Sequence, residues 1–170
     1  MKLILSFFLA IIFLCGCRSS ANEEEINLPA VTQTGENTAG CLIDGNIFVA
    51  QNGSPNIGST FIPYGILFSP PFDFAFSNYE KTEIINLHFV SVNAPGEYLT
   101  TEENAKAIFF KDKNGDYYFS KVNSGQLTIN KLENGIYSGT FAAVLYSETT
   151  NKIIQITNGR FDVNINTLNQ

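Results

Sequence analysis

The residue with the clearest chemistry is Cys17, which follows an apolar run at the start of the chain. Lys2 supplies a positive charge, residues 3–14 are almost uninterruptedly apolar, and the small Gly16 comes just before Cys17. The apolar run is shorter than the roughly 20 residues that a membrane-spanning helix needs. The pattern predicts a lipoprotein signal that is cleaved before Cys17, whose sulfur and new amino group are then acylated.

Acylation of Cys17 would attach the protein to a membrane through lipid. Two or three acyl chains hold a domain on a bilayer almost permanently. Arg18 stands where an aspartate would indicate retention in the inner membrane, so the sequence favours the outer membrane of a two-membrane bacterium. Residues 23–25 are all glutamate and resemble the acidic surface-export tags of Bacteroidetes lipoproteins, although a solvated tether has the same composition. The cell surface and the periplasmic face therefore both stay open.

Few residues have the types and spacing that catalysis needs. His88 is the only histidine, and no Cys-His spacing proposes a base for Cys41, which is expected to be a small buried hydrophobe. A hydrolase would require a cleft that brings Glu97, Glu102 or His88 together with a shifted pKa. The sequence therefore favours a protein without catalytic activity and suggests no cofactor.

The segment from Asp112 to Asp116 resembles the opening of a calcium-binding loop, because oxygen-bearing side chains alternate along it. A helix-loop-helix calcium loop has glycine at its sixth position and a bidentate carboxylate at its twelfth. Tyr117 and Asn123 occupy those positions here. We therefore expect a hairpin turn and no metal site.

The unusually aromatic stretch at residues 61–79 allows two interpretations. Alternation places the rings of Phe72, Phe74 and Phe76 on one face of a strand, which is typical of a buried core. The break at Pro70-Pro71 could instead hold the rings at the rim of a pocket for a small apolar or planar ligand. The candidate ligand-binding residues are Tyr64, Phe68, Phe72, Phe74 and Phe76.

Composition bounds the rest of the chain. The 170 residues carry a net charge of -6 and no Lys/Arg cluster, so nucleic acid is not an expected partner. Residues 18–39 are mainly polar and lack a helical or strand period. We expect a signal peptide at 1–16, the lipidated cysteine and a flexible tether at 17–39, and a single β domain at 40–170.

From residue 40 onward, short apolar runs alternate with turn dipeptides, which predicts an all-β domain. Asp44-Gly45 and Asn114-Gly115 mark hairpins, and a single helical turn is possible over 101–107. Consecutive strands should form one antiparallel meander, closed as a β-sandwich or a small barrel. Strands are expected at 83–92, 126–132, 136–146, 152–157 and 160–165.

Two polar features near the ends of the domain each have a structural and a functional interpretation. Residues 32–40 could lie extended across the domain and satisfy backbone groups, or could dock a partner near the membrane. Arg160 and Asp162 fall on the same side of a strand, which favours an ion pair or a hydrogen-bond bracket over a ligand site.

Blocks at both ends of the domain resemble a family of Bacteroidetes lipoproteins known only as a domain of unknown function. The resemblance implies a β fold and a lipoprotein's location, and it brings no catalytic residue or ligand. The matching blocks are Leu28-Pro29, Thr32-Gln33-Thr34-Gly35, Asn37-Thr38 and Gly40-Cys41-Leu42 with Gly45, and then Ser138-Gly139-Thr140-Phe141 and Ile156-Thr157-Asn158-Gly159-Arg160-Phe161-Asp162, which look like a closing hairpin.

Together these observations predict a lipid-anchored envelope protein that acts as a non-catalytic binding or accessory module. Its partners would be the membrane, through the lipid on Cys17, and either a small apolar ligand or an envelope protein. The alternative is a structural envelope protein that works through protein contacts alone.

Overall fold

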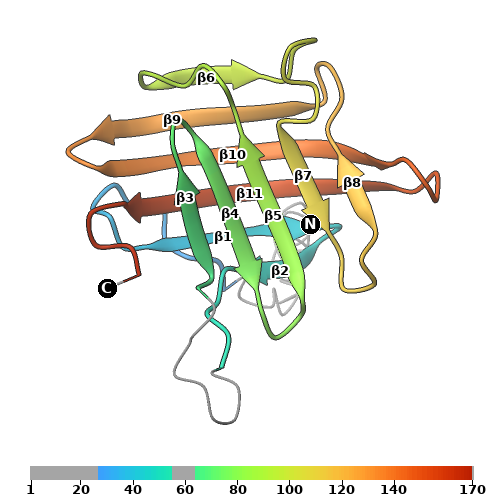
Figure 1. Ribbon diagram of the computed structural model, residues 1–170, viewed down its shortest axis with the longest axis horizontal. Helices are drawn as coiled ribbons and strands as arrows, with labels where there is room; N and C mark the ends of the chain where they lie inside the picture. The colour runs from blue at the N-terminus through green and yellow to red at the C-terminus, as the bar shows by residue number, and fades with distance from the viewer. Residues whose placement is uncertain (1–26, 55–63, 170) are drawn as a thin grey trace, which may run out of the picture.

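Eleven β-strands form the part of the chain that the computed structural model describes, residues 27–54 and 64–169 (Figure 1). No helix occurs among these residues, so none of them forms a helix that could cross a membrane. The strands are β1 (Thr38–Ile43), β2 (Asn46–Val49), β3 (Ile66–Ser69), β4 (Asp73–Asn78), β5 (Glu83–His88), β6 (Gly96–Leu99), β7 (Ile108–Lys111), β8 (Tyr117–Phe119), β9 (Gly125–Glu133), β10 (Ile136–Ser147) and β11 (Ile153–Asn164).

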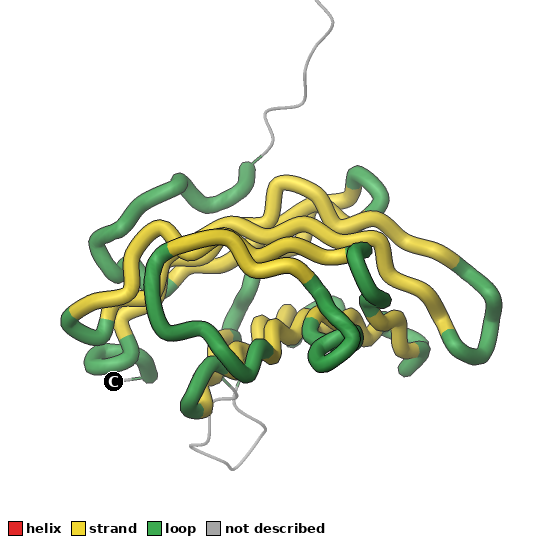
Figure 2. The backbone as a smooth tube through the Cα atoms, turned by 90° about the horizontal axis from the view of Figure 1, so that it is seen from above, coloured by secondary structure: helices red, strands yellow, loops and turns green. Residues whose placement is uncertain are grey.

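The strands form one antiparallel sheet that folds over itself into two layers. Its main path runs β2-β1-β11-β10-β8-β7-β5-β4-β3, and β9 carries β6 on a branch from β10. The front layer comprises β3, β4, β5, β7 and β8, and its strands cross those of the back layer, which comprises β6, β9, β10, β11, β1 and β2 (Figures 1 and 2). The predicted all-β sandwich or small barrel is confirmed.

Strand β10 joins the two layers because it has different neighbours along its length. Residues from Ile136 to Ala143 pair with β9 in the back layer, whereas Tyr146 and Ser147 pair with β8 of the front layer. On its other side β10 pairs with β11 over nearly its whole length. The sheet therefore divides near the end of β10.

A second junction closes the opposite corner of the sandwich. The amide of Gln51 donates to the Ser77 carbonyl at 2.8 Å, and the side chain of Asn78 donates to the Val49 carbonyl at 2.9 Å. A side chain on Gly65 would lie within 2.7 Å of the Gln51 nitrogen, so only glycine permits this approach. These bonds cover the outer edge of β2 at its last residue, Val49.

The tight turns follow the local sequence. Asp44 (φ 47°) and Gly45 (φ 81°) form the predicted hairpin between β1 and β2. Between β7 and β8, Asp112 Oδ1 accepts hydrogen bonds from the amides of Asn114 and Asp116, both at 2.9 Å. This carboxylate therefore holds its own hairpin turn, as expected from the sequence.

The prediction of separate strands at 152–157 and 160–165 is wrong, since β11 runs unbroken from Ile153 to Asn164. Asn158, at φ 53°, lies where the pairing of β10 and β11 shifts register between Phe141 and Ala143. The Asn-Gly pair therefore forms a bulge and not a turn, because β11 has strand partners on both sides. The hairpin expected from the family resemblance is present as β10–β11.

Two smaller expectations also need correction. The strand predicted over 83–92 ends at His88, and residues 101–107 form turns without a helix. In that loop Asn104 Oδ1 accepts from the Thr101 amide at 2.5 Å, so the asparagine side chain fixes the turn.

Residues 27–37, here called the N-terminal segment, lie across the outer face of the back layer (Figure 2). Thr32, Thr34, Gly35 and Glu36 all donate hydrogen bonds to Asp162 of β11. The packed domain thus includes residues that the sequence pattern assigned to a tether.

Candidate functional site

The aromatic residues predicted to line a pocket are mostly core. Phe72, Phe74 and Phe76 have no exposed surface. The Phe74 ring lies 5.1 Å from that of Phe72, 5.8 Å from that of Phe76 and 5.6 Å from that of Phe161, measured between centroids. With no surface left for a ligand, these three rings fit the core-strand interpretation, and we do not retain a ligand site on them.

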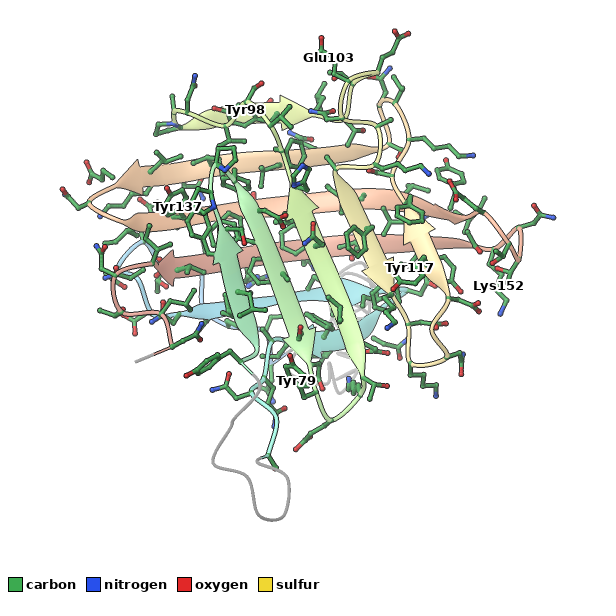
Figure 3. All side chains as sticks on the ribbon, viewed as in Figure 1. Tyr79, Tyr98, Glu103, Tyr117, Tyr137 and Lys152 are labelled. Carbon is green, nitrogen blue, oxygen red and sulfur yellow. The ribbon has the colours of Figure 1, made fainter. Side chains whose placement is uncertain are left out.

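The other two predicted residues lie at the margin of this core. Phe68 is half-buried, and its ring packs 4.8 Å from Phe74 and 5.2 Å from Tyr137, which Figure 3 labels. Tyr64 is also half-buried, but no ring contact within the described residues joins it to the cluster.

The candidate catalytic side chains are not assembled. His88 Nδ1 lies 3.1 Å from Asp73 Oδ2, and no hydrogen bond or ion pair of the described residues joins it to Glu97 or Glu102. Cys41 is fully buried, and this burial, helped by the charge of Glu83, raises the pKa of its thiol. Within residues 27–54 and 64–169, no three His, Cys, Asp or Glu side chains form a group that could hold a metal.

Asp162 forms the hydrogen-bond bracket that the sequence suggested. Its side chain accepts from Thr32 Oγ1 at 2.6 Å and from the amides of Thr34, Gly35 and Glu36 at 3.0, 2.9 and 3.3 Å. Burial alone would raise the pKa of this carboxyl group, but the four donors outweigh it and the pKa is lowered. Asp162 therefore stays ionised and fixes the N-terminal segment on β11.

Arg160 does not pair with Asp162 and instead supports the neighbouring part of the segment. Its Nε donates to the Asn158 carbonyl at 3.2 Å, and Nη1 donates to the Pro29 carbonyl at 3.3 Å. The two side chains thus hold the N-terminal segment at two places along β11.

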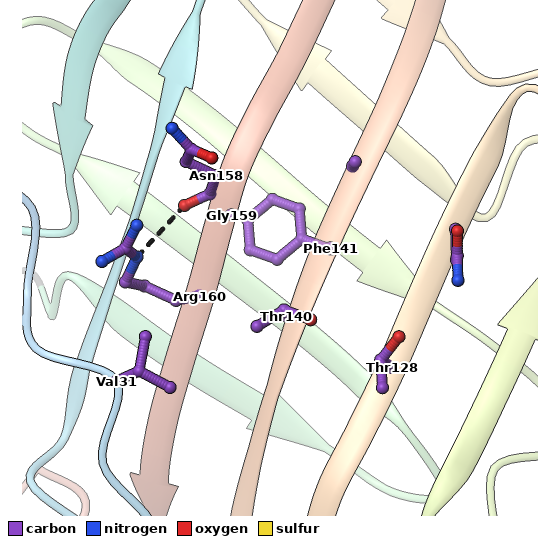
Figure 4. A pocket seen from close by; sticks show the side chains of 9 residues that line it. Val31, Thr128, Thr140, Phe141, Asn158, Gly159 and Arg160 are labelled. Carbon is purple, nitrogen blue, oxygen red and sulfur yellow. Dashed lines mark hydrogen bonds between the residues drawn. The ribbon is translucent and has the colours of Figure 1, made fainter.

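Beside this segment, the outer face of the back layer is hollowed into a groove (Figure 4). Its volume is about 320 Å³, with Val31 of the N-terminal segment as one wall and β9, β10 and β11 as the floor. The floor is low where Ala142 carries only a methyl group. A Cβ at Gly159 would lie 2.4 Å from the Phe141 carbonyl oxygen, so this position cannot accept a larger residue without a backbone shift. The lining residues are Val31, Gln126, Thr128, Thr140, Phe141, Ala142, Asn158, Gly159 and Arg160.

A second hollow continues the groove across the same face. It has a volume of about 370 Å³, shares Gln126 and Ala142 with the first, and extends to Leu99 and Gln155. The two hollows therefore extend from β11 across β10 and β9 to Leu99 at the end of β6.

The groove presents polar groups that are free to bind. The side chains of Gln126, Thr128, Thr140 and Asn158 line it, and none of them hydrogen-bonds another described residue. Amide and hydroxyl groups can each donate and accept. The lining therefore offers hydrogen-bonding groups to a ligand, beside the apolar side chains of Val31 and Ala142.

Sequence reasoning singled out Arg160, Asp162 and the segment above them but missed the groove itself. Gln126, Thr128 and Thr140 are ordinary polar residues on the solvent side of β-strands. The only local signal was Asn158-Gly159 inside an apolar strand pattern, which is typical of a bulge.

The described residues form a two-layer antiparallel β protein with a groove on the outer face of its back layer. Residues 73–163, more than half of the chain, match the model of a domain of unknown function, DUF6252. The chain belongs to this family, as the resemblance to an uncharacterised family anticipated. The match runs from β4 almost to the end of β11 and includes Asp162. Comparisons with curated proteins and with solved structures found no match.

Proposed function

We propose that the protein is a lipid-anchored component of the bacterial cell envelope that binds a polar ligand in the groove and performs no catalysis. The apolar run ending at Cys17 supports the anchor, and Arg18 supports the outer membrane as its location. The scattered positions of His88, Glu97 and Glu102 give no support to a hydrolase.

One observation carries the binding role: the groove is built by the segment that leads back toward Cys17. Val31 forms a wall, while Asp162 and Arg160 hold the segment on both sides of it. A tether that served only as a spacer would need none of these bonds. The groove would then lie on the face of the domain from which the anchor departs.

Metabolic labelling with an alkyne fatty acid tests the anchor. Cys17→Ser should abolish the label, whereas the matched Cys41→Ser variant, which changes a buried thiol, should keep it. Retention of label in Cys17→Ser would refute the lipidation. Digestion of intact cells with protease then distinguishes the cell surface from the periplasmic face.

A glycan array and a peptide array probed with the purified protein test the groove. Ala142→Trp fills both hollows and should abolish binding, whereas Ser69→Trp, at an exposed position of β3 outside the groove, should not. Equal binding by both variants would place the ligand elsewhere. Absence of any ligand would favour the structural alternative, in which the domain works through protein contacts.

A further inference from the structure

A pocket separate from the groove lies where β8 of the front layer meets the end of β10. It has a volume of about 500 Å³, large enough for a small organic molecule. Phe119 and Tyr146 stand on adjacent strands directly opposite each other in register, and both line the pocket with Val122. Their sequence neighbours Tyr118 and Leu145 point into the core. The two rings therefore face outward, away from the sandwich interior.

More aromatic side chains extend this surface across the front layer. Tyr117 lies nearly parallel to Phe119, at 10° and a centroid distance of 6.1 Å, and Phe109 lies 5.8 Å from Phe119. Tyr117 and Val122 are each 44% exposed. The solvent face of an antiparallel sheet is usually polar, so a continuous aromatic surface here indicates a contact site.

Lysine side chains surround the aromatic rings. Lys121 Nζ lies 4.1 Å from the centroid of the Tyr146 ring, and Lys106 Nζ lies 4.7 Å from that of Phe119. Lys111 stands over Tyr117 at 5.7 Å, and Lys152 lies on the same side of the molecule as Tyr117 (Figure 3). Two of these ammonium groups, those of Lys106 and Lys121, belong to residues that line the pocket, in a chain whose net charge is -6.

The lysines differ in the partners they already have. Lys106 forms an ion pair with Glu148, another residue of the pocket. Lys121 Nζ forms no ion pair with any carboxylate of the described residues, and it stands over the Tyr146 ring. Because a lysine ammonium has three donors, Lys121 can contact the ring and still bind an anion.

We propose that this pocket binds an organic acid whose carboxylate is carried on a six-membered ring. The ring packs against Phe119 and Tyr146, and the carboxylate pairs with Lys121. An acidic sugar residue and an aromatic acid share this chemistry. The site is separate from the groove, which lies on the back layer, and it adds a second, charged ligand to the protein.

Isothermal titration calorimetry with the purified full chain tests the site, using trigalacturonate and 4-hydroxybenzoate as the two probes. Binding of either probe supports the proposal, and the probe that binds identifies the source of the carboxylate. Neutral galactose trimers should bind at least about tenfold more weakly than trigalacturonate, because the charge-assisted hydrogen bond is lost.

Two variants locate the binding. Lys121→Gln should weaken it by about tenfold, whereas Lys113→Gln removes the same charge from the exposed β7–β8 turn and should leave it unchanged. Tyr146→Leu should weaken binding with an unchanged far-UV circular dichroism spectrum. Absence of heat with both probes at millimolar concentration, or equal affinities of Lys121→Gln and Lys113→Gln, would overturn the proposal.

Discussion

Replacement of Asp162 by asparagine tests whether the N-terminal segment is held by this carboxylate. The substitution keeps the size of the side chain but replaces one acceptor oxygen with an NH₂ group that faces backbone donors. Hydrogen bonds to a charged group contribute about 1.5–3 kcal/mol each, and those that share one carboxylate are not additive. Asp162 accepts from four residues, of which Thr32 and Gly35 lie closest, at 2.6 and 2.9 Å. We therefore expect a loss of about 2–4 kcal/mol in the free energy of unfolding.

Urea unfolding followed by far-UV circular dichroism measures this loss, since the chain has no tryptophan. Asp116→Asn is the matched control, because Asp116 is half-buried and its carboxylate accepts no hydrogen bond from the described residues. Thr32→Val, which removes only one donor, should cost about 1 kcal/mol. Hydrogen exchange should also become faster at the amides of Thr34, Gly35 and Glu36 in Asp162→Asn.

The pH dependence gives a second test of the same bracket. The folded pKa of Asp162 is lowered relative to an unfolded value of about 3.9, so its contribution is fully present above that pH. The contribution is lost as the pH falls through the folded pKa. The difference in the free energy of unfolding between wild type and Asp162→Asn should therefore be constant near neutral pH and should disappear in acid. A difference no larger than that of Asp116→Asn at pH 7, or one that persists undiminished to pH 2, would refute the reasoning.

Three further predictions address the core, the groove floor and the buried thiol. Phe74→Ala should destabilise the fold by about 3–5 kcal/mol in the same urea assay, because the ring is fully buried; a change below about 1 kcal/mol would contradict its core role. Gly159→Ala should lower the free energy of unfolding by about 1–3 kcal/mol, because the new Cβ clashes with the Phe141 carbonyl. Gly45→Ala is the control, since the space around Gly45 is open and only its φ of +81° opposes a side chain. A loss in Gly159→Ala no greater than that in Gly45→Ala would argue against the clash. Cys41 should resist alkylation in the native protein and react in denaturant, as peptide mapping by mass spectrometry can show, because burial raises the pKa of the thiol; rapid native reaction would count against its burial.

The hairpins were predictable because their chemistry is local. Asp44 and Gly45 both have positive φ, and this residue pair favours a tight hairpin through its local conformation. Asn158-Gly159 has a similar composition but forms a bulge, because β1 and β10 pair with β11 on both sides. Sequence alone does not reveal those distant partners.

The aromatic residues show the same limit for the candidate sites. Alternation correctly places Phe72, Phe74 and Phe76 on one face, but whether a face is core or surface depends on the second layer. In β7 and β8, aromatic residues occupy both faces, so the pattern of Tyr117, Tyr118 and Phe119 does not indicate which rings remain exposed. The pocket beside Phe119 becomes visible only when β10 is placed next to β8.

The bonds that hold the N-terminal segment also shape the groove, and under the proposed function this links the lipid anchor to the ligand site. Val31 can form a wall only while Asp162 fixes the residues that follow it and Arg160 holds Pro29 before it. Asp162→Asn should therefore weaken ligand binding in the groove even under conditions in which the variant stays folded. The reason is that the segment detaches before the sheet unfolds. Binding in the Phe119–Tyr146 pocket should stay unchanged in the same variant, since none of the residues lining that pocket belongs to the segment or contacts Asp162. Equal losses at both sites would mean that Asp162 acts through overall stability, and that the groove does not depend on the segment.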